Sequence, residues 1–196
     1  MYNTNLVQEA PKSFMDLTKP VYKDMGIMPS PLYSGAAAYN LSLMTRTSGL
    51  GWDFYKGLKE NGMKVDKGNG GILKAVGEGQ KGVGIVVDFM VFRAQKKGAP
   101  VQFVYPAEGS PIVTEPIGIV KGAKNEKLAK LFEDFVLSEE GQTFTAEMGY
   151  IPVRKGVKAP EGMKSIEELK IMSGNLADLV SNREADKKEF TSLFQK

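Results

Sequence analysis

The stretch that decides the fold is Pro29–Ser30–Pro31–Leu32–Tyr33–Ser34–Gly35–Ala36–Ala37–Ala38–Tyr39. Its two early prolines favour an extended backbone and remove two N–H donors. Ser34 is a good helix N-cap, and the alanine run that follows it strongly favours a helix. The stretch therefore predicts the end of a strand, a tight turn and a helix that begins at Ser34–Gly35.

The start of this helix is a candidate anion site. The first N–H groups of a helix have no partner within it, and they carry the positive end of the helix dipole. The hydroxyl of Ser34 and the uncrowded backbone of Gly35 and Ala36 suit an anion, above all a phosphate. Tyr33, directly before Ser34, is counted among the candidate ligand contacts. An ordinary capped helix without a ligand is the alternative interpretation.

Composition excludes several kinds of site. The 196 residues are 42% hydrophobic and 25% charged, which is typical of a globular chain. The net charge is only +3, with lysines and acids interspersed, so no nucleic-acid partner is expected. The chain has no cysteine and no histidine, which excludes thiol nucleophiles, Ser-His-Asp triads and most zinc sites. A metal would have to be held by oxygen atoms of Asp, Glu, Tyr or backbone carbonyls, and we expect no metal and no cofactor.

Predicted strands and helices alternate along the chain, which indicates an α/β protein. The β-branched run Val83–Asp88 predicts a strand buried on both faces. Other strands are predicted over 27–28, 65–67, 101–105 and 117–120. Helices are predicted over 12–19, 35–47, 50–60, 72–78, 89–97, 125–136, 139–148, 165–173 and 175–195.

Two further polar residues lie at strand-to-helix junctions. Asp88 follows the apolar run, where burying a carboxylate is costly unless it has a partner. Asp88 therefore either caps the next helix or accepts hydrogen bonds from the hydroxyls or amine of a ligand. Asn69 ends the preceding strand and opens a helix in the same way. A parallel sheet would bring Ser34–Gly35, Asn69 and Asp88 to one edge, where ligands bind in open α/β sheets.

An ordered set of short motifs resembles one protein family. The chain is similar to type 2 periplasmic solute-binding proteins of ABC importers, in the cluster described for ferric iron, phosphonates, thiamine or sugar phosphates. The resemblance implies a binding-protein lobe with a mixed sheet flanked by helices, followed by C-terminal helices. It rests on Tyr2–Val7, Pro11–Leu17, Pro31–Ala36, Gly68–Gly70, Val86–Asp88, Val104–Pro106, Glu108–Gly109 and Phe135–Gln142.

The resemblance also implies roles for site residues. Ser34, Gly35 and Ala36 match the turn that grips the anion, and Asp88 matches a contact for the polar body of an organophosphate or phosphonate. Iron binders of this cluster carry two adjacent tyrosines after the long apolar strand. Phe89 and Met90 stand at those positions here. This departure removes the phenolate ligands, so we expect no ferric site.

The beginning of the chain resembles the first crossover between the two lobes of the family. We therefore expect a fragment: residues 1–104 as the second lobe, 105–150 as the return crossover with first-lobe elements, and 151–196 as a C-terminal helical segment. A fragment would explain why no signal peptide is seen. The amphipathic helix 125–136 would then lack its usual sheet, which makes self-association into a homo-oligomer an expectation.

Together these features predict a binding protein rather than an enzyme. The expected function is capture of a small phosphorylated or phosphonate solute, outside the cytoplasm, for an ABC permease in the membrane. The alternative within the class is ferric-iron binding with a synergistic anion. Alternatives from other classes are a sensory ligand-binding module and an anion-binding transferase, although the chain offers the transferase no plausible base or nucleophile set.

Overall fold

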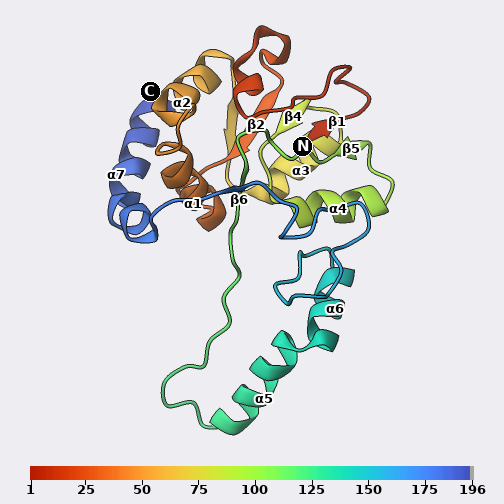
Figure 1. The fold of residues 1–196 in the computed structure, drawn as a ribbon. Coiled ribbons are helices and arrows are strands. Elements are labelled where there is room, and N and C mark those ends of the chain that lie inside the picture. Colours follow the sequence, from red (N-terminus) through yellow and green to blue (C-terminus); the bar gives the residue numbers. More distant parts are fainter. Residues whose placement is uncertain (195–196) are drawn as a thin grey trace. The chain divides into compact units, whose positions relative to one another are not determined.

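The computed structural model describes residues 1–194, and the chain divides into two compact units (Figure 1). The first unit consists of Met1–Val113 together with the C-terminal segment that begins at Lys170. The second unit is Thr114–Leu169. The second unit is thus an insertion in the sequence of the first.

A mixed five-stranded sheet forms the centre of the first unit, in the order β3-β2-β4-β1-β5. β2 runs parallel to both β3 and β4, whereas β1 runs antiparallel to β4 and β5. Ile27 of β2 faces Lys64 on one side and Gly84 on the other. The α/β class with a mixed sheet is therefore confirmed. The strands are β1 (Tyr2–Asn3), β2 (Gly26–Pro29), β3 (Lys64–Asp66), β4 (Val83–Gly84) and β5 (Val101–Gln102).

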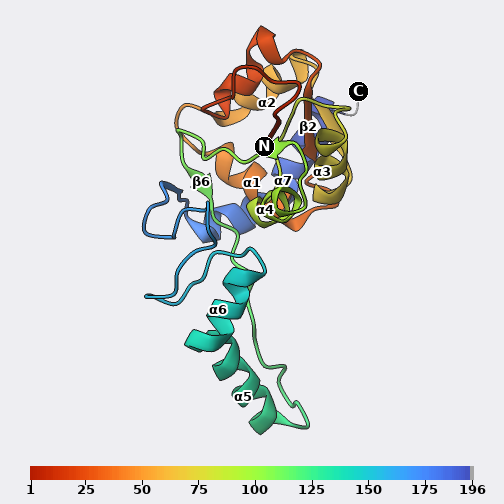
Figure 2. The ribbon, with the colours of Figure 1, turned by 90° about the vertical axis from the view of Figure 1, so that its right-hand side faces the viewer.

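Helices cover both faces of this sheet. On one face α1, α2 and α7 pack around Met28, and on the other α3 and α4 pack around Ile27. Neighbouring residues of a strand point to opposite faces, which explains this division. In Figure 2, α4 accordingly lies in front of α7. The helices are α1 (Gly35–Met44), α2 (Gly51–Glu60), α3 (Asn69–Gly77), α4 (Asp88–Lys96) and α7 (Leu176–Phe194), with short 3₁₀ helices at Met15–Thr18 and Pro20–Tyr22.

The first unit also contains a separate parallel pair of strands, β6 (Ser110–Pro111) and β7 (Ile171–Met172). This pair joins the chain on either side of the insertion. Ser110 faces Ile171 and Pro111 faces Met172. The pair therefore brings together segments that the whole second unit separates in sequence.

The second unit contains α5 (Glu126–Leu137) and α6 (Glu139–Glu147), which meet at Ser138. The Ser138 hydroxyl donates to the carbonyl of Phe135 at 2.7 Å and accepts from the N–H of Gly141 at 3.1 Å, so one side chain serves both helix ends. Gln142 connects this corner to the following loop, because its Oε1 accepts from the N–H of Val153 at 2.8 Å. No residue of α5 is buried.

Several predicted elements differ from the structure. Only Val83–Gly84 of the run 83–88 is a strand, and Asp88 is already the first residue of α4. The predicted strand 117–120 is wrong, because that segment has no regular secondary structure and pairs with no strand, and Val120 is 78% exposed. The predicted helix 165–173 is also wrong, since it is a turn followed by β7. The assignment of 1–104, 105–150 and 151–196 to lobes stays a prediction.

Candidate functional site

The ends of the three parallel strands place the candidate residues at one edge of the first unit's sheet. β2, β3 and β4 run in the same direction, and each is followed by a helix that begins at that edge. The junctions carry Ser34–Gly35–Ala36 before and within α1, Asn69 at the start of α3, and Asp88 at the start of α4. The structure therefore gives these junctions the common edge that the sequence predicted.

The turn into α1 is held by Ser30. Its carbonyl accepts from the N–H groups of Tyr33 at 3.2 Å and Ser34 at 3.0 Å, and its hydroxyl accepts from the N–H of Leu32 at 3.2 Å. Its own N–H donates to the carbonyl of Asp66 at the end of β3, at 2.7 Å. The turn is thereby fixed to the neighbouring strand, so that the start of α1 is positioned by the sheet.

Ser34 is the N-cap of α1, as predicted. Its backbone is extended, and its hydroxyl oxygen accepts from the N–H of Ala37 at 3.2 Å. Within residues 1–194, no hydrogen-bond partner is found for the N–H groups of Gly35 and Ala36. Gly35 is exposed, and nothing lies within 4 Å of where a Cβ on it would be. The helix start thus offers two N–H groups and the Ser34 hydroxyl to an anion.

Asn69 is the first residue of α3, after the N-cap Gly68. The carbonyl of Gly68 accepts from the N–H groups of Gly71 at 3.1 Å and Ile72 at 3.4 Å, which closes the first turn of α3. The Asn69 side chain is half-buried and makes no hydrogen bond within the described part of the chain. Its amide is therefore available to a ligand at this edge.

Asp88 is the first residue of α4 rather than its N-cap, which is Val87. Its carboxylate accepts from the N–H of Phe89 at 2.8 Å, so it contributes to the first turn of the helix. Burial raises the pKa of Asp88, and no ion pair with it occurs among residues 1–194. A half-buried carboxylate without a cation leaves hydrogen-bonding capacity for a ligand's hydroxyl or amine.

The remaining expected contacts give a mixed result. The Tyr33 side chain is 70% exposed, so its ring does not pack against the candidate site. Phe89 and Met90 are half-buried at the start of α4, and the Arg93 guanidinium stacks over the Phe89 ring at 4.9 Å. In the described residues, no cluster of three or more acidic side chains is arranged to hold a metal ion.

Comparison with known proteins identifies the family. The family model described as bacterial extracellular solute-binding protein matches residues 1–182. The chain belongs to this family. The expectations of a periplasmic binding protein, of a place outside the cytoplasm and of a binding protein rather than an enzyme are thereby confirmed. No described helix is long and apolar enough to span a bilayer.

Individual relatives agree with the family. An uncharacterized protein of Haemophilus influenzae is 34% identical over 149 residues, which are 73% of this chain and 42% of that protein. A probable ABC transporter periplasmic-binding protein, y4fP, of Sinorhizobium fredii is 26% identical over 74% of this chain and 43% of its own. This solute-binding chain spans less than half of the length of these curated relatives.

A solved structure shows the same fold. Iron-bound HitA from Pseudomonas aeruginosa superposes with a TM-score of 0.74 and 26% identity, over 96% of this chain and 65% of HitA. About a third of HitA therefore has no counterpart in the residues of this solute-binding chain.

An ion-pair cluster behind α1 was missed by the sequence analysis. Asp186 of α7 is buried and accepts from the Arg46 guanidinium at 2.7 and 3.1 Å and from the Ser42 hydroxyl at 2.6 Å. Arg46 also donates to the Ser42 carbonyl in the last turn of α1, at 2.9 Å. The cluster joins α1 to α7 and so holds the helix whose first turn is the candidate anion site. No local pattern could have shown it, because its partners are 140 residues apart.

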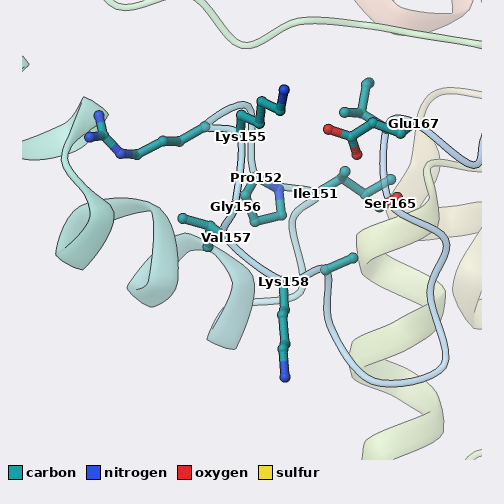
Figure 3. Close-up of a pocket in the computed structure, with 11 residues that line it drawn as sticks. Ile151, Pro152, Lys155, Gly156, Val157, Lys158, Ser165 and Glu167 are labelled. Carbon is teal, nitrogen blue, oxygen red and sulfur yellow. The ribbon is translucent and has the colours of Figure 1, made fainter.

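A cavity of about 340 Å³ lies in the loop of the second unit (Figure 3). None of the predicted site residues lines it. Lys155 and Lys158 extend in opposite directions from their shared loop, and Glu167 stands on the facing segment. Because its charged groups do not converge, we assign no ligand to this cavity.

Proposed function

We propose that this chain is the solute-binding part of an ABC importer and that it captures a small phosphorylated or phosphonate solute. The observation that carries the proposal is the edge where three parallel strands end. There the start of α1 presents the free N–H groups of Gly35 and Ala36 beside the Ser34 hydroxyl. The relative named as a probable ABC transporter periplasmic-binding protein supports the transport role.

The roles of the site residues follow from their chemistry. Ser34, Gly35 and Ala36 donate hydrogen bonds to the oxygens of the anion, and the dipole of α1 favours its negative charge. The negative charge of Asp88 would repel the anionic group. Its carboxylate therefore accepts hydrogen bonds from hydroxyl or amine groups in the rest of the solute. The side-chain amide of Asn69 can donate or accept a hydrogen bond at the same edge. The solute is therefore expected to combine an anionic group with hydrogen-bond donors.

Ferric iron is the second candidate, because HitA is described as iron-bound. Phe89 and Met90 argue against it for this chain, since neither a phenyl ring nor a thioether is a ligand that hard ferric iron prefers. A sensory module would use the same residues as an importer. Neighbouring genes for a permease and an ATPase, rather than for a kinase, would support the importer.

The substitution Ser34→Asp tests the site. Aspartate caps helices well, so α1 should remain folded, but its charge would repel the anion. Titration calorimetry with inorganic phosphate and a panel of phosphorylated metabolites should show binding by the wild type and a loss of at least tenfold in affinity in the variant. Charge-assisted hydrogen bonds contribute about 1.5–3 kcal/mol each, which makes a loss of this size a minimum.

Ser138→Asp is the matched control, because Ser138 caps α6 in the way that Ser34 caps α1. It should leave affinity unchanged. Equal affinity in wild type and Ser34→Asp would refute the site. A coloured complex with ferric citrate would instead favour the iron alternative.

We also propose that the chain self-associates as a homo-oligomer. Five large apolar side chains of α5 are substantially exposed in the second unit, and a surface of this kind favours association. They are Leu128, Leu131, Phe132, Phe135 and Leu137.

A further inference from the structure

The side chain of Asn40 contains a buried oxygen with no partner. Asn40 lies on α1, and its Oδ1 makes no hydrogen bond with any of residues 1–194. Leaving a buried carbonyl oxygen unpaired is costly, because the oxygen has given up its hydrogen bonds to water and gained none in return. Buried polar atoms are for this reason almost always paired in native proteins, with protein groups or with ordered water.

Asn40 lines a small cavity of about 20 Å³ within the first unit. The cavity lies between the end of β2, the buried face of α1 and side chains of α2 and α7. A volume of about 10–15 Å³ already admits one water molecule, whereas a solute needs hundreds. The space that a water-sized probe can reach there is therefore about the size of one water molecule.

The walls of the cavity explain why the protein supplies no donor to Asn40. Pro29 and Pro31 form part of the wall, and proline has no N–H. The other lining side chains are hydrocarbon or thioether, except that of Tyr55. The Tyr55 hydroxyl lies 3.6 Å from the Sδ of Met44, which is a weak acceptor. The prolines that shape the turn into α1 thus leave Asn40 dependent on another donor.

Tyr55 remains a neutral hydroxyl in this setting. Burial raises its pKa strongly, and the negative charge of Asp186 adds to the effect. The hydroxyl therefore keeps its proton and retains a free lone pair beside the weak contact to Met44.

We propose that this cavity is a binding site for one ordered water molecule, which donates a hydrogen bond to Asn40 Oδ1. The Tyr55 hydroxyl is the second polar group on the wall and its natural second partner, which gives the water the two partners that a buried water requires. Such a water connects α1 to α2 behind the turn that leads to Ser34. The water belongs to the structure of α1, the helix proposed to bind the anion. The water site does not depend on whether an anion binds there.

A crystal structure of the wild-type chain at a resolution that shows ordered water tests the proposal directly. The expected result is a density peak in the cavity at hydrogen-bonding distance from Asn40 Oδ1. A cavity without such a peak would overturn the proposal. So would a Tyr55 hydroxyl that has turned to donate directly to Asn40.

Water ¹⁷O relaxation dispersion tests it in solution, because it detects waters that stay bound for nanoseconds to microseconds, much longer than ordinary surface water. Asn40→Leu removes the acceptor and fills the cavity, so this variant should show one long-lived water fewer than the wild type. Asn5→Leu is the control, because Asn5 is exposed, and it should show no change. An unchanged number of long-lived waters in a folded Asn40→Leu variant would contradict the proposal. If that variant does not fold, the wild-type crystal structure decides.

Discussion

The two compact units of this chain bury their side chains very differently. The first unit has apolar cores on both faces of its sheet, with Phe54, Leu58 and Ile72 inaccessible to solvent. In the second unit the buried residues are glycines, prolines, one alanine and one glutamine, and Phe132 remains 61% exposed. Both units have well-formed amphipathic or capped helices. The comparison shows that helix-forming sequence and core-forming contacts are separate requirements.

The difference has a thermodynamic meaning. Burial of apolar surface is the main favourable term in folding, and it must offset the loss of chain entropy. The first unit meets this requirement through its own residues. The second unit gains little from its own burial, so its stability should depend on what its apolar side chains contact in solution.

The largest expected effect comes from matched phenylalanines in the two units. Phe190 is 1% exposed and packs against the rings of Tyr55 and Phe194. Phe190→Ala should lower the free energy of unfolding by about 3–5 kcal/mol. Phe132→Ala should change it by no more than about 0.5 kcal/mol at a protein concentration low enough to keep the chain monomeric. Urea denaturation measures both, and equal losses would break the comparison.

The second-largest expected effect comes from comparing a buried ion pair in the first unit with an exposed ion pair in the second. Asp186→Ala leaves Arg46 without its buried partner, which should cost about 3 kcal/mol. Glu126→Ala removes an exposed pair with Lys130 on α5 and should cost less than about 1 kcal/mol. The test is the difference in unfolding midpoint between the variants at low and high salt. A larger loss from Glu126→Ala would show that the second unit is better ordered than its burial suggests.

Self-association tests whether the exposed side chains of the second unit find a partner. The double substitution Phe132→Glu and Phe135→Glu places charge among them and should shift the protein toward monomer in sedimentation velocity. Lys127→Glu with Lys130→Glu alters charge on the same helix without removing apolar area, and should leave the distribution unchanged. A wild type that is already monomeric at high concentration would contradict the proposed homo-oligomer.

The smallest expected effect is a pH dependence at Asp88. Burial raises the pKa of Asp88 above its ordinary value. The folded state then binds this proton more tightly than the unfolded state, so the free energy of unfolding decreases as pH rises from about 4 through the raised pKa. Asp88→Asn removes that decrease and should be no less stable than wild type at neutral pH.

The same Asp88→Asn variant should lose affinity for solutes that offer hydroxyl or amine donors. Thermal unfolding of both proteins between pH 4 and pH 7, followed by titration with solute, separates the two effects. Parallel stability profiles would show that the buried carboxylate imposes no cost. Unchanged affinity would remove Asp88 from the proposed site.

Local signals in the sequence were enough to predict much of the first unit and its site. The N-cap role of Ser34 depends on residues within one turn, and the common edge of the junctions follows from parallel strands. The predicted strand 117–120 failed because a β-branched run becomes a strand only where another strand pairs with it. The partners Arg46 and Asp186 could not be predicted, since no local rule connects residues 140 apart.

The packing of α7 against α1 has a consequence for synthesis on the ribosome. Phe190 and Asp186 complete the core beside α1, yet 140 residues separate Asp186 from Arg46. At about 5–20 residues per second, the ribosome needs about 7–28 s to cover that interval. During this time the nascent chain holds the apolar side of α1 and α2 open, and the whole second unit is made before it can close. Chaperone binding to the nascent chain should therefore last until α7 has emerged from the ribosome.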